Sequence, residues 1–553
     1  MEEDTHGPTN SPFCDPTGNL ALWTLFFVPN TINKPVLIDA ADPERALTRG
    51  RVTDLVGSLA GAFEPEVAVC LHLPNDVLYP VLMLSIWANG GMWTGSNIAY
   101  TEHELRHHLL MSGTCRIITM PEQLPTVAAA VLDVWPEVEV IIFSDILRKQ
   151  ATPEERVEGF RSLHDIQRPF DDTNELAVAS DLEGYIAALQ STSGTAGLPK
   201  VSIRTHKSLM LESMAIEDRA IAKPYEEGAE QPYEIRRLFC TPIFHAFSTP
   251  LMAINSIRYG HTTYIMRRFD DTFAQKVFDF QITETAAAPP MLMKLCEQNE
   301  SHHLLQSLRK VWSGGAPLSQ DLRSRFLGIF ANPLRIVQVW GMTEGGWFTT
   351  FQRCEDDSTG SVGRPLKGVE IKVDRSKDGL QLRGDKKTGE LLVRSEQLMV
   401  GYLRDESATS DAFDGDWLRT GDVGYIEDGK VFLVDRAKDL IKVNGWQVSS
   451  AEIEGVLLEH EAVKDVAAVS AGSGVDEHPL VVIVPRFLPS PENMGLALSI
   501  MPSLEDLLRT RLARYKVAKI EFGFVESIPR NSSGKILRQE LKSWAEEQGL
   551  LER

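Results

Sequence analysis

Residues 190–200, QSTSGTAGLPK, bring hydroxyl side chains, glycines and a closing lysine into one short stretch. The hydroxyls can donate hydrogen bonds, the glycines let backbone N–H groups turn toward one anion, and Lys200 adds a positive charge. This combination suits the phosphates of a nucleotide. A Walker loop is excluded because the Gly-Lys-Ser/Thr ending is absent, and a flexible polar linker is the alternative. The candidate phosphate-binding residues are Ser191, Thr192, Ser193, Gly194, Thr195 and Lys200.

Three further segments downstream combine glycines with charged residues: VQVWGMTEGG (337–346), DWLRTGDVGYIEDGKVFLVDRAKDLIKVNGWQV (416–448) and IPRNSSGKILRQEL (528–541). In order and spacing, these segments and the first loop resemble the adenylate-forming enzymes. That superfamily comprises acyl- and aryl-CoA ligases, firefly-type luciferases and the adenylation domains of peptide synthetases. The resemblance covers roughly residues 50 to 545 and is closest in style to the 4-coumarate:CoA-ligase-like enzymes.

The resemblance implies that a carboxylate attacks the α-phosphorus of ATP, which gives acyl-AMP and pyrophosphate. Two anions meet in this step, so the site must neutralise charge. The phosphate loop is expected on the β- and γ-phosphates, Thr343 on the α-phosphate and Glu344 on Mg²⁺, which prefers oxygen ligands. Taken alone, Glu344 is equally typical of a helix start, where it offsets the dipole.

The resemblance also assigns the nucleoside. Trp340 stands where relatives usually have Tyr and is expected to pack on adenine, Asp422 to accept the ribose hydroxyls, and Arg436 to contact the same sugar. The alternatives are a core tryptophan, a turn aspartate and a surface ion pair. Further nucleotide-site residues implied are Gly315, Ala316, Pro317, Gln338 and Val339.

Lys535, in NSSGK, is the expected catalytic lysine and is predicted to follow a glycine turn at the start of the last helix. Its ammonium would touch the substrate carboxylate and the α-phosphate together. In the family, the small domain that carries this lysine rotates after adenylation, with the hinge at the position of Lys438. The opposite face, used for thioester formation, would present Lys442, Gly445 and Gln447.

His245, in TPIFHAF, matches a family histidine beside the acid pocket, although a lone histidine among aromatic residues is often a core residue. None of the expected pocket residues is acidic or basic apart from His245, which favours an apolar or aromatic monocarboxylic acid. The bulk of Trp312 and Val339 predicts a short pocket. The expected substrate-binding residues are His245, Phe247, Leu251, Trp312, Gly315 and Val339.

The thiol acceptor is expected to be CoA, bound by Arg268, Asn444 and Gly445. Asn444 replaces a second lysine of plant-type ligases, which removes one positive contact to CoA. Transfer of the acyl-AMP to a separate carrier-protein thiol or to an amine is therefore the alternative. A nucleotide-binding regulator without catalysis is disfavoured because Lys200, Glu344 and Lys535 are all retained. Nothing specific supports luciferase-like oxygenation.

A chain of 553 residues is too long for one core, and alternating apolar runs and helical patterns predict an α/β architecture. We expect a large N-terminal domain of β-sheets packed with helices (1–435) and a small, mobile C-terminal α+β domain (436–553). The net charge of −21 argues against binding of nucleic acid or membrane surfaces. The polar start and the short apolar run 77–88 show no signal peptide or membrane span, so a cytoplasmic location is expected.

Several elements can be predicted individually. Buried strands are expected at 67–73, 115–120 and 138–144, helices at 77–88 and 101–113, and a solvated connection at 150–180. The C-terminal domain should contain helices at 449–463 and 536–550 and strands at 466–471 and 480–486. Six scattered cysteines without metal-ligand spacing predict reduced, buried thiols.

Overall fold

The computed structural model resolves the elements of both predicted domains. It describes residues 18–26, 33–132, 138–168, 184–192, 199–221, 233–351, 355, 357–376, 388–443, 446–472, 477–486, 499–512, 514, 516–517, 519–531 and 534–550. Within these residues, no helix combines the length and apolar character needed to cross a bilayer.

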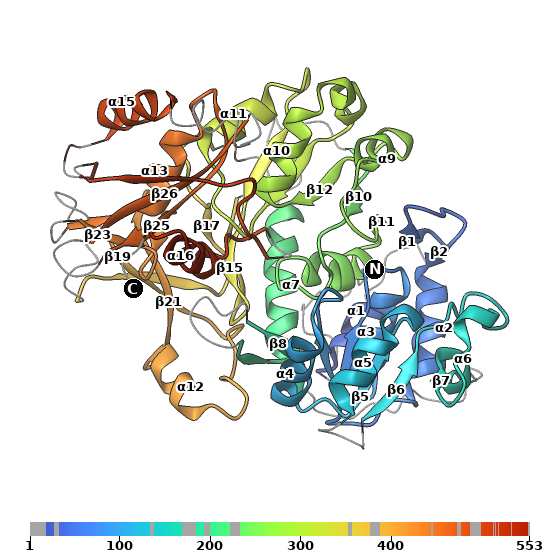
Figure 1. Cartoon of the computed structure of the whole chain (residues 1–553). Helices are drawn as coiled ribbons and strands as arrows, with labels where there is room; N and C mark the ends of the chain where they lie inside the picture. The colour runs from blue at the N-terminus through green and yellow to red at the C-terminus, as the bar shows by residue number, and fades with distance from the viewer. Residues whose placement is uncertain are drawn as a thin grey trace, which may run out of the picture.

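Two seven-stranded sheets form the N-terminal part (Figure 1). The first is parallel except at its edge, where β2 runs antiparallel to β1. Its spatial order is β14 (Arg335–Gln338), β13 (Lys310–Ser313), β12 (Glu284–Ala287), β10 (Arg236–Phe239), β11 (Thr262–Ile265), β1 (Pro35–Asp39) and β2 (Ala46–Thr48).

The second sheet is parallel except for the hairpin of its last two strands. Its order is β7 (Arg161–Ser162), β6 (Glu139–Ile142), β5 (Arg116–Thr119), β3 (Ala68–His72), β4 (Met92–Gly95), β8 (Ile186–Ser191) and β9 (Val201–Thr205). Parallel strands need crossover connections, and the helices between them supply these.

Helix α3 (Leu78–Ala88) is almost entirely apolar in sequence, and every one of its residues is buried. It packs against α1, α2 and the π-helix η3. The other helices of this part are α1 (Leu20–Leu25), α2 (Arg49–Ala60), α4 (Glu102–Ser112), α5 (Leu124–Val131), α6 (Leu163–Ile166), α7 (His206–Ile221), α8 (Ser256–Arg258), α9 (Phe273–Asp279), α10 (Pro289–Glu297) and α11 (Gln320–Leu327), with short turns η1 (Pro121–Gln123), η2 (Pro153–Glu155), η3 (Pro250–Asn255) and η4 (Asn299–Leu305).

Antiparallel strands follow the first sheet. One group is β15 (Trp340–Met342), β16 (Gly346–Thr350) and β17 (Arg364–Pro365). The next is β18 (Glu370–Asp374), β19 (Gly389–Arg394), β21 (Trp417–Glu427) and β20 (Phe413–Asp414), with β22 (Lys430–Arg436) on β21 and helix α12 (Glu406–Ala412) before β20.

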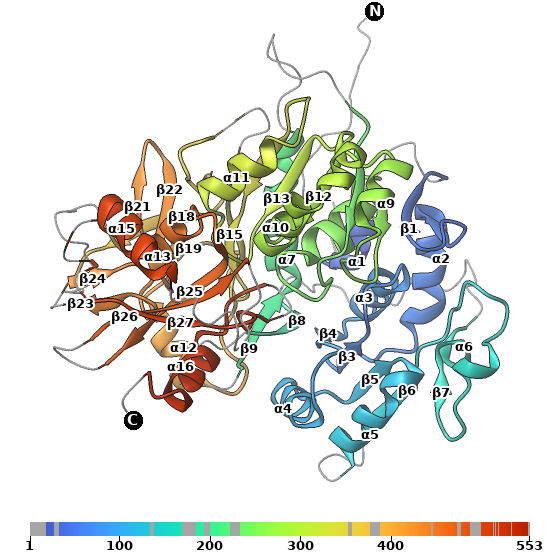
Figure 2. The same ribbon diagram turned by 45° about the horizontal axis from the view of Figure 1, so that its top comes forward.

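The C-terminal elements gather on one side of the molecule, as Figure 2 shows. They are the hairpin β23 (Ile441–Val443) and β24 (Trp446–Val448), the sheet β25 (Val463–Ala471), β26 (His478–Pro485) and β27 (Glu521–Phe524), and helices α13 (Ser450–Leu457), α15 (Met501–Arg511) and α16 (Arg538–Glu547). These elements bury apolar clusters of their own. The α/β fold class with a small C-terminal domain is confirmed. The boundary after residue 435 stays a prediction.

Most of the predicted elements are confirmed: β3, β5, β6, α3, α4, β25 and β26 lie where the patterns placed them. Residues 151–161 of the solvated connection predicted at 150–180 are exposed or half-buried as expected, but residues 153–168 also form short elements. There η2 and α6 form, and β7 extends the sheet by pairing with β6. Residues 169–183 lie outside the described residues. Helix α13 ends at Leu457 rather than 463, because residues 458–462 turn the chain into β25.

The prediction of buried thiols is confirmed for two cysteines and wrong for a third. Cys70 and Cys240 are buried, whereas Cys115 is exposed at the entry to β5. Cys296 is half-buried, and Cys14 and Cys354 lie outside the described residues.

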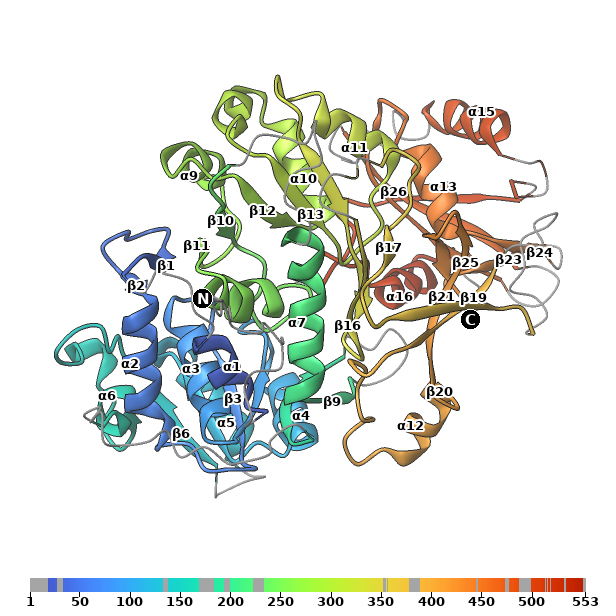
Figure 3. The same cartoon turned by 180° about the vertical axis from the view of Figure 1, so that it is seen from behind.

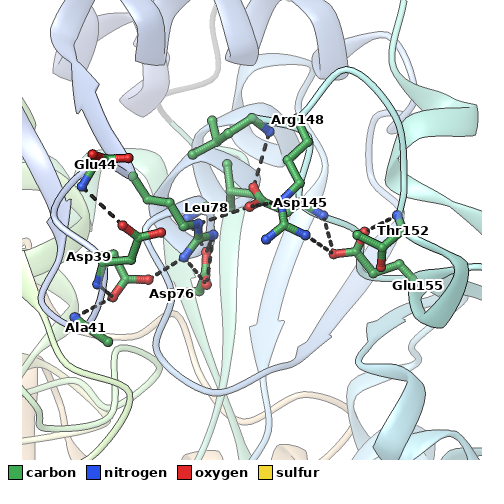
Figure 4. Close-up of polar contacts among 12 residues, drawn as sticks. Asp39, Ala41, Glu44, Asp76, Leu78, Asp145, Arg148, Thr152 and Glu155 are labelled. Carbon is green, nitrogen blue, oxygen red and sulfur yellow. Dashed lines mark hydrogen bonds and ion pairs between the residues drawn. The ribbon is translucent and has the colours of Figure 1, made fainter.

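One arginine ties the two large sheets to α3. The guanidinium of Arg45 pairs with Asp39 at the end of β1, with Asp76 just before α3 at 3.3 Å, and with Asp145 after β6 at 3.0 Å (Figure 4). All four side chains are at most 20% exposed. Burial raises the pKa of Asp76 and Arg45 opposes that shift. Arg45 therefore neutralises acidic groups that three separate segments bring together.

We expect Arg45→Met to lower the free energy of unfolding by about 2–4 kcal/mol at pH 7.5, since the carboxylates would be left without their shared cation. The loss should shrink toward pH 5, because the pKa of Asp76 is raised and its protonation relieves the repulsion among the three carboxylates. Urea denaturation at both pH values measures this, with Arg51→Met, an exposed arginine on α2, as control. A loss that does not change with pH would contradict this account.

Candidate active site

Two glycine-containing segments leave the carboxyl ends of neighbouring parallel strands. Ser313 at the end of β13 pairs in register with Gln338 at the end of β14, and residues 314–317 and 339–344 follow directly. Gly315 adopts a φ of +84°, a backbone conformation that favours glycine. Ligands of open α/β sheets bind outside the carboxyl ends of strands. This edge of the sheet is therefore the candidate nucleotide site.

The predicted phosphate loop connects β8 to β9 as a hairpin. The Thr192 N–H donates to the Lys200 carbonyl at 2.8 Å, and the Lys200 N–H donates to Thr192 Oγ1 at 3.2 Å. These bonds close the base of the loop. Ser193, Gly194 and Thr195 lie outside the described residues. Ser191 ends β8 opposite Val201.

Tyr402 connects this hairpin to the predicted metal ligand. Its hydroxyl donates to Glu344 Oε1 at 2.8 Å, and Lys200 Nζ lies 5.0 Å from the centre of its ring. Burial raises the pKa of Tyr402, and the neighbouring Glu344 carboxylate raises it further. The backbone around Tyr402 pairs with β9, where the Leu403 N–H donates to the Val201 carbonyl at 2.8 Å. Tyr402 was not predicted from the sequence, because it lies 58 residues from Glu344 along the chain.

The predicted nucleoside residues form one hydrogen-bonded group. Trp340 Nε1 donates to Asp422 Oδ2 at 2.7 Å, and Arg436 Nε lies 2.8 Å from Asp422 Oδ1. Asp422 and Arg436 face each other in the register of β21 and β22. The indole of Trp340 is 4% exposed and packs edge-on against Phe348. The structure thus brings these three residues together, and their contacts to a nucleoside stay predictions.

Lys535 lies in a tight turn before the last helix. Its N–H donates to Asn531 Oδ1 and its carbonyl accepts from the Asn531 N–H, both at 2.9 Å. The predicted glycine turn before Lys535 is present, and α16 starts at Arg538 rather than at residue 536. Gly534 has a φ of +84°, and a Cβ there would lie 3.3 Å from Pro290 Cγ at the start of α10. The turn therefore rests on the N-terminal part of the chain.

The ammonium of Lys535 is partly buried among other cations. Burial lowers its pKa to about 7, and repulsion from Arg436 and Lys438 acts in the same direction. Asp439 and Asp422 oppose the shift without cancelling it. A lysine in this setting gains charge stabilisation when an anion binds beside it.

His245 lies in the turn before η3, close enough to Lys535 for their charges to interact. Burial lowers the pKa of His245 to about 4, and Lys535 adds to the shift. The imidazole is therefore neutral near pH 7. Its Nδ1 accepts from the Phe247 N–H at 3.3 Å, which assigns the ring proton to Nε2.

The predicted acid-pocket residues lie around the same strand ends. The Phe247 ring lies against Gly314, where an added Cβ would come within 2.9 Å of it. Leu251 is fully buried in η3, and Val339 is 9% exposed.

Trp312, on β13, has cations nearby that the sequence did not suggest. Lys310 Nζ lies 4.2 Å and the Arg237 guanidinium 5.1 Å from its ring centre. Glu284 accepts from both cations, at 2.8 Å from Lys310 Nζ and 3.1 Å from Arg237 Nε. A buried ionic layer thus lies next to Trp312, one of the predicted pocket residues.

The remaining predicted residues have less defined surroundings. Gln338 Nε2 donates to the Ser361 carbonyl at 3.1 Å, Thr343 is partly buried before Glu344, and Ala316 and Pro317 follow Gly315. Arg268 is exposed after β11. Asn444, Gly445 and the side chains of Lys442 and Gln447 lie outside the described residues. The CoA and hinge assignments stay predictions.

Comparison with known proteins tests the resemblance. Residues 28–403 match the family model of the AMP-binding enzymes, and residues 452–535 match the model of the AMP-binding enzyme C-terminal domain. Acyl-CoA ligase M9 from Phoma sp. is 44% identical over 92% of this chain and 93% of its own length. Phenylacetyl-CoA ligase epaB from Aspergillus niger is 34% identical over 96% and 98%.

The fold agrees with a solved structure. The anthranilate CoA ligase AuaEII, crystallised with anthranoyl-AMP, superposes with a TM-score of 0.80 over 97% of this chain and 98% of that one, at 22% identity. The 4-coumarate:CoA-ligase-like subtype is not distinguished by these matches and stays a prediction. By the two family models and the full-length relatives, the chain belongs to the AMP-binding enzymes of the adenylate-forming superfamily.

Proposed function

We propose that this protein is an AMP-forming acyl-CoA ligase, an acid–thiol ligase that activates a carboxylic acid with ATP and transfers the acyl group to CoA. The observation that carries the proposal is the position of Lys535. The C-terminal part presents this ammonium beside Arg436 and His245, next to the strand ends where the nucleotide residues converge. Named acyl-CoA ligases of nearly the same length support the second half of the reaction.

The nucleotide side of the site is rich in groups that bind phosphate. Lys200 and the backbone of its hairpin would hold the β- and γ-phosphates, and Thr343 the α-phosphate. Glu344 is an oxygen ligand of the kind Mg²⁺ prefers, fixed by the hydroxyl of Tyr402. Among the described residues, no three acidic, histidine or cysteine side chains cluster as a metal site, so phosphate oxygens and water would complete the coordination of an ion there. Bound Mg²⁺ would neutralise phosphate charge.

Lys535 would act in the first half-reaction. Its ammonium would neutralise the substrate carboxylate and the α-phosphate as they meet, so that the carboxylate oxygen attacks phosphorus and pyrophosphate leaves. The neutral His245 would adjoin the carboxylate without adding a charge. Rotation of the C-terminal part about Lys438 would then withdraw Lys535 and bring Lys442 and Gly445 to the thiol.

The substrate is proposed to be an aromatic or apolar monocarboxylic acid. The side chains of Phe247, Leu251 and Val339 are apolar, and Trp312 would close the far end of the pocket. A relative named for phenylacetyl-CoA formation has an aromatic acid as its substrate, which agrees with this choice.

Pyrophosphate release tests the proposal across a panel of aromatic and aliphatic acids, each run with and without CoA. We expect acid-dependent release that yields acyl-AMP without CoA and a thioester with CoA. Acyl-AMP that forms but is not converted to a thioester when CoA is added would contradict the CoA step. It would favour a carrier-protein thiol or an amine as the acceptor. No release with any acid would contradict the enzyme assignment.

The pH dependence of adenylation should report Lys535. In the free enzyme the pKa of Lys535 is lowered to about 7, so kcat/KM for ATP should fall as the pH rises through that value and the ammonium is lost. Lys535→Arg should remove this decline, because a guanidinium stays charged. Lys535→Ala should lower kcat by about two to four decades.

The measurement is pyrophosphate exchange between pH 6 and 9. Lys519→Ala, an exposed lysine of the same domain, is the control and should keep the wild-type profile. Identical profiles for the wild type and Lys535→Arg would exclude Lys535 as the titrating group.

A further inference from the structure

A buried glutamate on α7 contacts β16, the strand that follows the turn of Glu344, the predicted metal ligand. Glu212 is 2% exposed. Its Oε1 accepts from the backbone N–H of Trp347 at 3.0 Å, and its Oε2 pairs with Arg204 Nη2 at 3.0 Å. Burial raises the pKa of Glu212 and the pair with Arg204 opposes that shift. Figure 3 shows α7 beside β16, the strand that begins at Gly346.

The backbone between Glu344 and β16 is held from two sides. Gly346 has a φ of +71°, and a Cβ at this position would lie 2.1 Å from Glu212 Oε1. The carboxylate thus fills the space that a side chain would occupy. From the other side, Gln397 Nε2 donates to the carbonyls of Gly345 at 2.8 Å and Trp347 at 2.7 Å.

Trp347 carries this restraint to the acid pocket. Its indole stacks on the ring of Phe247, with centroids 5.6 Å apart and planes 16° from parallel, and its Nε1 donates to the Phe247 carbonyl at 3.1 Å. Phe247 in turn lies against Gly314, beyond the end of β13. One residue therefore connects the turn of Glu344 to a wall of the pocket.

We propose that Glu212 is a positioning residue. Through the N–H of Trp347, it fixes the position of the turn of Glu344 relative to the acid pocket. The part of this role that concerns the acid pocket rests on the function proposed above. Arg204, which pairs with the carboxylate, lies on β9, four residues after Lys200. The pair of Glu212 and Arg204 would then be one buried support shared by the phosphate hairpin, the turn of Glu344 and the acid pocket.

A buried ion pair can also be an ordinary part of a core, and replacing such a pair with apolar groups is often neutral. The N–H of Trp347 distinguishes the two roles, because a buried N–H without an acceptor is strongly unfavourable. The acceptor oxygen, rather than the charge, should therefore be what the active site needs.

Two double variants separate the acceptor from the charge. R204M/E212Q removes the ion pair and keeps an amide oxygen for Trp347, whereas R204M/E212M removes the pair and the acceptor in a side chain of similar length. Thermal unfolding monitors the fold of both. Calorimetry gives the affinity for ATP, and pyrophosphate exchange gives kcat and KM for the acid.

We expect R204M/E212Q to stay within about threefold of the wild type in these constants. R204M/E212M should lose about tenfold or more in kcat/KM for the acid and bind ATP more weakly, since small misplacements of reacting groups are costly. Equal constants in the two variants would overturn the proposal, whether both stay active or both fail. A wild type inactive with every acid would contradict both the proposed function and the role of Glu212 at the acid pocket. The affinity of the two variants for ATP would still test whether Glu212 supports the turn of Glu344.

Discussion

A lysine ammonium held among other cations is the constraint on which this site depends. Lys535 reaches Arg436 and Lys438 from a turn of the C-terminal domain, and burial lowers its pKa to about 7. Such a charge is unfavourable until an anion arrives. ATP and a carboxylate supply anions, so binding of the substrates and docking of Lys535 favour each other.

The rest of the fold brings groups of defined charge to this point. Parallel strands β10, β13 and β14 belong to one sheet, and His245, Gly315 and Thr343 follow the carboxyl ends of these strands although they are distant in sequence. The antiparallel hairpin of β8 and β9 adds Lys200 from the second sheet, and Tyr402 joins it to Glu344. Arg45 holds the two sheets to α3 through acidic residues from each. The strands thus position the N-terminal groups, and the turn at Lys535 supplies the last cation from the C-terminal domain.

The sequence predicted the parts of this arrangement that local patterns encode. Apolar runs predicted β3, β5, β6 and the buried helix α3, and short glycine motifs predicted Lys200, Glu344, Asp422 and Lys535. Contacts between distant segments had no such signal. The bond from Tyr402 to Glu344 spans 58 residues and that from Glu212 to Trp347 spans 135. The place of Lys535 in a turn also depends on tertiary contact, since the side chain of Asn531 and the surface at Pro290 hold it there.

Proton uptake on ATP binding tests the central claim most directly. Calorimetric titrations with Mg²⁺ and ATP near pH 8, in buffers of different ionisation enthalpy, give the number of protons bound with the nucleotide. The account predicts that the wild type takes up more protons than Lys535→Met, because ATP raises the pKa of Lys535 and recharges its ammonium. Equal proton uptake by the two proteins would contradict the claim that Lys535 awaits an anion in a partly neutral state.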